Sequence, residues 1–262
     1  MKVAPLTLCL GAVFLGVGCA EPNPLDETSQ GVGVTAASAR SASLAFDAMA
    51  GTGPSCASVT TACTTYPCDG EVAITVGGEC GLRLGLSGGT VTVKGSWSDA
   101  NSATMQTVFA SVQAGGKTYA YESVTQMSVD RSGNSTTVQF SAANAAARSD
   151  VSGAALASTN TWTAVVDSKG TTDENDDTMT ISSSSVSASA GLGASAAVVK
   201  LSEVVISPDC DKNPISGTGD STKVEGIIPK IDSIAFHSAC DGKAEFNNKS
   251  YAFNVNVDVS AK

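Results

Sequence analysis

Apolar side chains recur at every second position through much of this sequence, which is the spacing at which the residues of an extended strand share one face. Val72, Ile74 and Val76 show the pattern, and glycine pairs such as Gly77-Gly78 and Gly88-Gly89 fall between successive runs as turn signals. Because polar residues alternate with the apolar ones, one face of each strand is expected in the core and the other in solvent. The pattern predicts strands at residues 71–76, 82–86, 91–93, 105–113, 117–129, 136–142, 178–181, 197–206, 231–237 and 251–259.

These strands predict an all-β fold, arranged as an antiparallel meander or a sandwich, with a curved open sheet as a third arrangement. Only 5% of the residues are aromatic, and many strand residues are Ala, Ser, Thr or Gly, so the core is expected to be thin. One short N-terminal helix is expected at residues 35–49, ended by the segment Gly51-Thr-Gly-Pro54. Residues 143–159 suit either a short helix or a long loop, and residues 182–197 are interpreted as a strand of small residues.

The N-terminus has the pattern of an export signal, because a positive residue is followed by an apolar run shorter than the roughly 20 residues needed to cross a bilayer. The segment Leu15-Gly-Val-Gly-Cys19 resembles a bacterial lipobox, in which the cysteine becomes an acylated N-terminus, although Gly16 stands where such boxes usually carry Leu. The resemblance implies a lipoprotein signal peptide over residues 1–18, palmitate on Cys19, and anchoring in the cell envelope at the outer membrane. The alternative is an ordinary secretory signal cleaved near Ala20.

The rest of the chain is predicted to have two parts. Residues 19–50 are expected to form a lipid-anchored flexible tether, because residues 20–34 combine proline and glycine with acidic and polar side chains that bury little apolar surface. Residues 51–262 are expected to form a β domain stabilised by disulfides.

Cysteine number and spacing support that domain. Of eight cysteines, Cys9 lies in the signal and Cys19 is the anchor candidate. The other six are Cys56, Cys63, Cys68, Cys80, Cys210 and Cys240. An even set of six in an exported chain indicates three disulfides, and the spacing favours a bond between Cys210 and Cys240, with the remaining four pairing among themselves. A zinc site is disfavoured because the first four show no Cys-x-x-Cys pair.

The tripeptide Cys-Asp-Gly occurs at residues 68–70 and again at 240–242, each time ahead of a strand pattern. With Cys210-Asp-Lys-Asn-Pro-Ile-Ser-Gly217, the second copy resembles the C-terminal end of uncharacterised bacterial surface lipoproteins. The resemblance covers the C-terminal part of the chain and, loosely, the region from Cys68 to Trp97. The two copies indicate a repeated unit of cysteine, tight turn and strand, while the resemblance implies a fold and no activity.

Composition excludes several chemistries. The formal net charge of −10 disfavours nucleic acid as a partner. A Ser-His-Asp hydrolase would need His237, the single histidine, but no Gly-x-Ser-x-Gly elbow accompanies it. Glycoside hydrolysis needs two carboxylates held across a cleft. The candidate acids are separated in the sequence, and no pattern selects a pair among Glu122, Asp130, Asp167 and Glu203. We therefore expect no enzyme, no cofactor and no metal, with Asp173, Asp176 and Asp177 as weak calcium candidates.

Aromatic residues leave two interpretations open. Trp97, Tyr119, Tyr121 and Trp162 could stack on a sugar or line an apolar cavity, while packing within the sheet is the ordinary explanation. The leading hypothesis is a lipid-anchored, non-enzymatic envelope protein with a structural or adhesive role. A carrier of a lipid or another apolar ligand is the alternative, and a secreted hydrolase is the third. The partner, whether a protein or an apolar ligand, stays open apart from the membrane itself.

Overall fold

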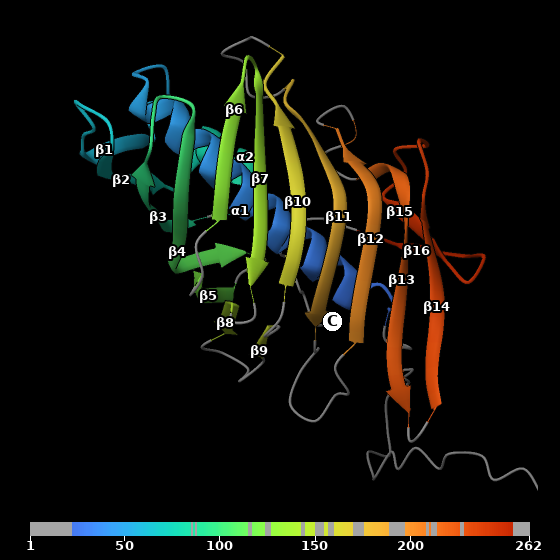
Figure 1. Ribbon diagram of the computed structural model, residues 1–262. Coiled ribbons are helices and arrows are strands. Elements are labelled where there is room, and N and C mark those ends of the chain that lie inside the picture. The colour runs from blue at the N-terminus through green and yellow to red at the C-terminus, as the bar shows by residue number, and fades with distance from the viewer. Residues whose placement is uncertain are drawn as a thin grey trace, which may run out of the picture.

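A computed structural model describes residues 23–84, 86, 88–114, 117–123, 127–142, 145–149, 155–156, 160–169, 176–188, 197–207, 210, 214–225 and 228–253. It shows one antiparallel sheet with a long helix lying across one of its faces (Figure 1). The helices are α1 (Asp26–Met49) and α2 (Gly78–Leu84). The strands are β1 (Ala57–Thr61), β2 (Cys68–Thr75), β3 (Gly88–Trp97), β4 (Ser102–Ala114), β5 (Lys117–Ser123), β6 (Met127–Ser132), β7 (Ser135–Ala142), β8 (Ala145–Ser149), β9 (Ala155–Leu156), β10 (Asn160–Asp167), β11 (Thr178–Ala188), β12 (Ala197–Ile206), β13 (Pro214–Glu225), β14 (Ile228–Phe236), β15 (Lys243–Phe246) and β16 (Lys249–Ala252).

The strands form an open meander, as the alternation of apolar residues predicts. The main path runs β1-β2-β3-β4-β6-β7-β10-β11-β12-β13-β14-β15-β16, so that β1 and β16 are the two edges. Strands β5, β8 and β9 leave this path, with β5 pairing with β4 and β8, and β8 pairing with β9. The all-β prediction is confirmed, in its open-sheet form.

Helix α1 connects the two edges of the sheet. The Asn23 side-chain amide, just before the helix, donates a 2.7 Å hydrogen bond to the carbonyl of Ala252 in β16, while the helix also contacts β1 and β2. The 24-residue helix is about 36 Å long, whereas thirteen strands at about 4.8 Å spacing extend for about 58 Å. The sheet must therefore curve around the helix, and we call the face that carries α1 the concave face.

Burial against the concave face accounts for the helical structure of α1, although its sequence consists largely of small residues. Every residue from Thr35 to Phe46 is buried, and a helix buried on all sides needs no polar stripe. Two buried serines have hydrogen-bond partners: Ser41 donates to the Ala37 carbonyl at 2.7 Å, and Ser43 donates to the Thr136 hydroxyl on β7 at 3.3 Å. Among the described residues, no helix is long and apolar enough to cross a membrane.

Our expectation of a flexible tether over residues 19–50 is wrong for residues 26–49. The helix begins at Asp26, where the preceding Leu25 amide donates to the Asn23 side chain at 3.1 Å. It is thus longer than the short helix expected at residues 35–49, because packing against the sheet outweighs the low helix propensity of Gly31 and Gly33. Residues 1–22, which include Cys19, lie outside the described part.

Three further local expectations change, and a fourth lies partly outside the described residues. The pattern predicts a strand at residues 82–86, but Leu82 and Leu84 belong to helix α2, which the Cys56–Cys80 disulfide joins to the turn before β1. The strand expected at 117–129 is divided into β5 and β6, which have different partners. Residues 143–159 contain the short strands β8 and β9 instead of a helix or a long loop. The final strand is described only to residue 253, so its predicted alternation to residue 259 lies outside the described residues.

Three disulfides have the pairing that the spacing favours. Cys210 is bonded to Cys240, Cys56 to Cys80 at α2, and Cys63 to Cys68 across the loop between β1 and β2. The two Cys-Asp-Gly units differ, however. The second forms the expected turn, with positive φ at Cys240 (51°) and Gly242 (64°), whereas the first lies inside β2.

Candidate functional site

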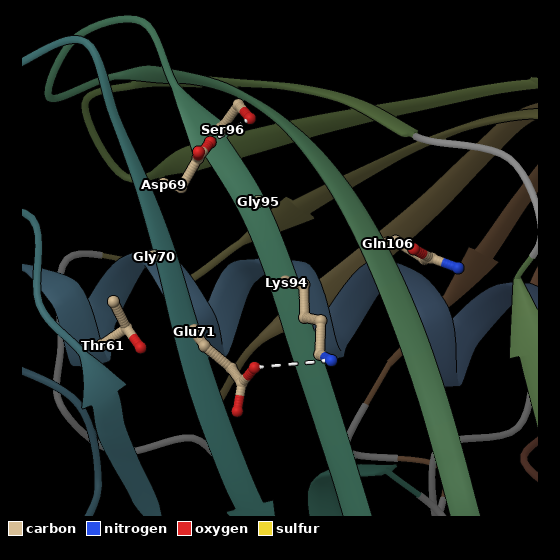
Figure 2. A pocket seen from close by; sticks show the side chains of 8 residues that line it. All are labelled: Thr61, Asp69, Gly70, Glu71, Lys94, Gly95, Ser96 and Gln106. Atoms are coloured by element: carbon tan, nitrogen blue, oxygen red, sulfur yellow. Dashed lines mark hydrogen bonds and ion pairs between the residues drawn. The ribbon is translucent and has the colours of Figure 1, made fainter.

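A polar groove crosses the outer face of strands β1 to β4, on the side of the sheet opposite α1. Strand β2 alternates between buried residues such as Val72 and more exposed ones such as Asp69 and Glu71, and the more exposed set faces the groove. The groove has a volume of about 270 Å³. Its lining residues are Thr61, Asp69, Gly70, Glu71, Lys94, Gly95, Ser96 and Gln106 (Figure 2).

One side of the groove is a row of four side chains placed by strand register. Thr61 is paired with Glu71, Glu71 with Lys94, and Lys94 with Gln106, so each of the four strands contributes one residue. Three strand spacings make this row about 14 Å long. The Lys94 ammonium lies 3.6 Å from a carboxylate oxygen of Glu71, and the Thr60 hydroxyl donates to the other oxygen at 3.1 Å.

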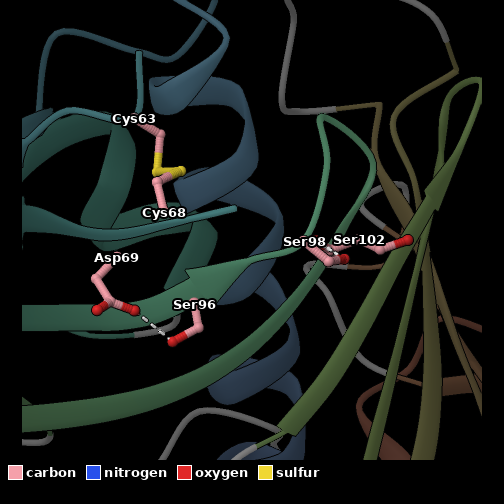
Figure 3. The surroundings of a disulfide bond; sticks show 6 residues. All are labelled: Cys63, Cys68, Asp69, Ser96, Ser98 and Ser102. Carbon is pink, nitrogen blue, oxygen red and sulfur yellow. Dashed lines mark hydrogen bonds between the residues drawn. A yellow bond between two sulfur atoms is a disulfide. The ribbon is translucent and has the colours of Figure 1, made fainter. Parts of the chain in front are cut away.

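A second row lies two residues along the strands, about 7 Å from the first. Here Asp69 is paired with Ser96, and the Ser96 hydroxyl donates a 2.5 Å hydrogen bond to the Asp69 carboxylate. Figure 3 shows this pair beside the Cys63–Cys68 disulfide. The disulfide therefore restrains the chain next to one end of the second row.

The floor between the rows is a glycine pair fixed from below by a tryptophan. Gly70 and Gly95 are directly opposite each other in β2 and β3. A Cβ atom at either position would lie only 2.9 Å from Cζ3 of Trp97, and at Gly95 also 3.1 Å from Cγ of Met105. Trp97 is 1% exposed and makes an edge-on contact with Phe46 of α1, with ring centroids 6.2 Å apart. The groove floor is thus packed onto the buried helix.

The groove offers balanced hydrogen-bonding groups. Glu71 is paired with Lys94 and Asp69 is hydrogen-bonded to Ser96, while Gln106 supplies both an amide donor and a carbonyl acceptor. The lining therefore mixes donors with acceptors, and its two carboxylates and one ammonium give a formal charge of −1. Such a surface can bind a polar ligand through several modest hydrogen bonds.

An exposed aromatic residue precedes the groove in the chain. Tyr66 is 46% exposed and lies in the loop that the Cys63–Cys68 disulfide closes. It is three positions before Asp69, so their Cα atoms are at most about 11 Å apart. The disulfide limits the conformations of this loop and hence the entropy lost when Tyr66 contacts a ligand.

The residues that we selected from the sequence are not brought together. His237 is exposed beyond the end of β14, where its Nε2 lies 3.4 Å from a carboxylate oxygen of Glu245, and β14 is far from β1–β4 in strand order. Asp176 and Asp177 precede β11, and Asp173 lies outside the described part. Among the described residues, no group of three or more His, Cys, Asp or Glu side chains is placed to hold a metal ion.

The four acidic residues considered for glycoside hydrolysis lie on four different strands. Glu122, Asp130, Asp167 and Glu203 lie on strands β5, β6, β10 and β12. Among them, Asp167 has a lowered pKa, because the Lys169 side chain and then its backbone amide donate hydrogen bonds to the carboxylate. The side-chain bond is 2.9 Å long and exposed, which makes it a local surface interaction.

The two tryptophans have the ordinary packing role. Trp97 and Trp162 are both buried, and Trp162 stacks on Phe140 with ring centroids 5.5 Å apart. Tyr119 and Tyr121 lie on β5, and their side chains are outside the described part.

Sequence reasoning did not select the groove residues. Alternation with Val72 and Ile74 places Asp69 and Glu71 on the solvent side, but only the strand register brings Lys94 and Gln106 beside them. A comparison of the chain with protein-family models finds no match, and comparisons with curated proteins and with solved structures find none either. The groove and the filled concave face are therefore the basis for a functional assignment.

Proposed function

We propose that this protein is a non-enzymatic adhesive protein of the bacterial cell envelope, anchored by lipid on Cys19, and that the outer face of its sheet is the binding surface. The N-terminal residues 1–18 and the lipobox resemblance support export and anchoring. The three disulfides are consistent with an oxidising compartment outside the cytoplasm.

The observation that carries the proposal is the difference between the two faces of the sheet. On the concave face, α1 is buried along residues 35–46 and occupies the space that an apolar ligand would need. On the outer face, the groove between β1 and β4 remains open and polar. This difference favours an outward-facing binding protein over a carrier that encloses a lipid.

The anchor can be tested in cells that express either the wild-type chain or Cys19→Ser. We expect labelled palmitate to be incorporated only into the wild-type chain, and an antibody against the β domain to bind intact wild-type cells. Equal palmitate labelling of both chains would contradict lipidation at Cys19.

Adhesion is tested with the same cells. Wild-type cells should attach to at least one of a panel of surfaces, coated with polysaccharide, with protein or left uncoated, in larger numbers than Cys19→Ser cells, which release the protein. Equal attachment, with the wild-type protein displayed on the cell surface, would contradict the adhesive role.

A further inference from the structure

We propose that the groove across β1–β4, together with Tyr66, binds a short segment of an uncharged carbohydrate chain. This inference rests on the proposed adhesive function and specifies the class of ligand for the same surface. It follows from the pairing of the charges, the shape of the groove and the exposed aromatic residue in the loop between β1 and β2.

The charges in the groove favour a neutral ligand. Glu71 is already paired with Lys94 and accepts a hydrogen bond from Thr60, and Asp69 accepts one from Ser96. Two carboxylates and one ammonium give the groove a formal charge of −1, which repels an anion, while a cation would compete with Lys94 for Glu71. Sugar hydroxyls both donate and accept, so they can add to the existing pairs without breaking them.

The shape of the groove favours an extended chain. The first polar row runs across four strands for about 14 Å, and the pair Asp69 and Ser96 lies about 7 Å from it on the two middle strands. The floor between them is the backbone of Gly70 and Gly95, held in place by Trp97 beneath it. At about 270 Å³ the groove is somewhat smaller than typical pockets that bury a small molecule. An oligosaccharide segment lying along the groove, partly exposed to solvent, fits this geometry.

Tyr66 supplies the apolar contact that sugars use in addition to hydrogen bonds. An exposed phenol ring presents a flat face that can pack against the C–H groups of a pyranose, while its hydroxyl stays hydrated. The Cys63–Cys68 disulfide restrains the Tyr66 loop, and the same bond holds the start of β2, where Asp69 lies. One disulfide therefore restrains both the loop that carries Tyr66 and the first residue of the strand that carries Asp69.

Other ligand classes fit less well. The groove contains one lysine and two carboxylates, and the chain has a net charge of −10, so that a nucleic-acid backbone would be repelled. A divalent ion would find only two carboxylates in the groove, each already hydrogen-bonded.

The test measures binding of three uncharged trisaccharides to the purified full chain: β-1,4-linked N-acetylglucosamine, β-1,4-linked glucose and α-linked mannose. The chain is kept in a detergent without a sugar headgroup, and binding is followed by isothermal titration calorimetry. We expect saturable binding of at least one trisaccharide, with an affinity that changes little with added salt, because no ion pair forms with the ligand.

Matched variants locate the site. Gln106→Ala and Tyr66→Ala should each weaken binding about threefold to tenfold, as expected for loss of one hydrogen-bonding or aromatic contact. Gln139→Ala, which changes an exposed glutamine on β7, and Lys200→Ala, on β12, should leave the affinity unchanged. Circular dichroism spectra identical to wild type show that each variant is folded.

Two results would overturn the inference. One is the absence of saturable binding to all three trisaccharides by the folded wild-type chain. The other is binding that Gln106→Ala and Tyr66→Ala leave unchanged, or that Gln139→Ala weakens equally. These results are distinct from failure of the adhesive function, which is measured by attachment of intact cells and by palmitate labelling.

Discussion

Replacing Phe46 by alanine tests whether α1 is part of the core or a linker. Phe46 is 2% exposed, and its ring meets the edge of Trp97 under the floor of the groove. Removing a buried phenylalanine side chain costs about 3–5 kcal/mol, through lost transfer free energy and the cavity left behind. This is a large part of the roughly 5–15 kcal/mol that stabilises a typical domain.

The effect should be visible as a lower melting temperature. In a domain of this size, each kcal/mol changes Tm by about 2–4 °C, so the Phe46→Ala variant should melt about 6–20 °C below wild type. Thermal unfolding is followed by far-UV circular dichroism with the disulfides oxidised in both proteins. A double-mutant cycle with Trp97→Ala should give a coupling of about 0.5–1.5 kcal/mol, since the two rings touch.

Tyr66→Ala is the matched control, because it removes an aromatic ring from an exposed site. Its Tm should stay close to wild type, since surface substitutions usually change stability by less than about 0.5 kcal/mol. If Phe46→Ala were as stable as Tyr66→Ala, α1 would not be packed against the sheet, and the argument that it fills the concave face would fail.

Three further predictions concern the groove floor, the disulfides and the Asp167 carboxylate. Gly95→Ala should destabilise by about 1–3 kcal/mol in urea unfolding, because its Cβ would lie 2.9 Å from the indole ring beneath the groove; unchanged stability would show that the ring does not support the floor. Removing the Cys210–Cys240 disulfide should lower the free energy of unfolding by about 3.5 kcal/mol, and removing Cys63–Cys68 should lower it by about 2 kcal/mol, because they close loops of 30 and 5 residues. A larger loss of stability in urea unfolding for the Cys63–Cys68 variant would refute this reasoning. Because the folded pKa of Asp167 lies below its ordinary value of 3.8, its interaction with Lys169 stabilises the fold above that pH and is lost as the pH falls through the lower folded pKa. An NMR titration should show the pKa rising towards 3.8 in Lys169→Ala, and an unchanged pKa would contradict the assigned cause.

The strands could be predicted because their local pattern and their burial agree. Val72 and Ile74 are fully buried in β2, and Val91 and Val93 are fully buried opposite them in β3. Period-two alternation is a property of each segment, so it needs no knowledge of the partner strand. The disulfide between Cys210 and Cys240 was predictable for a similar reason, since spacing in the chain favoured it.

The helices were harder because tertiary contacts decide them. Residues 26–34 resemble a linker in composition, and α1 has no polar face because it is covered on all sides in its second half. The alternation of Leu82, Leu84 and Leu86 resembles a strand, yet Leu82 and Leu84 form α2 beside the Cys56–Cys80 disulfide. Burial and cross-linking overrode the local pattern in both places.

The groove depends on register, which a single sequence does not specify. Thr61, Glu71, Lys94 and Gln106 form one row only because of the register of four strands, which includes a shift in β1 between Val59 and Thr61. A slip of one residue in any pair would send one of these side chains to the other face of the sheet. No local motif near Lys94 or Gln106 indicates that they share a surface.

Hydrogen exchange along α1 tests most directly the claim that the chain's own helix fills the concave face. In the full chain at neutral pH, amides of residues 35–46 should exchange as slowly as those of the central strands β10 and β11, because both open only when the core does. Mass spectrometry of peptides from the two regions gives the comparison. Complete exchange of residues 35–46 within seconds, with β10 and β11 still protected, would show a mobile segment and contradict the account.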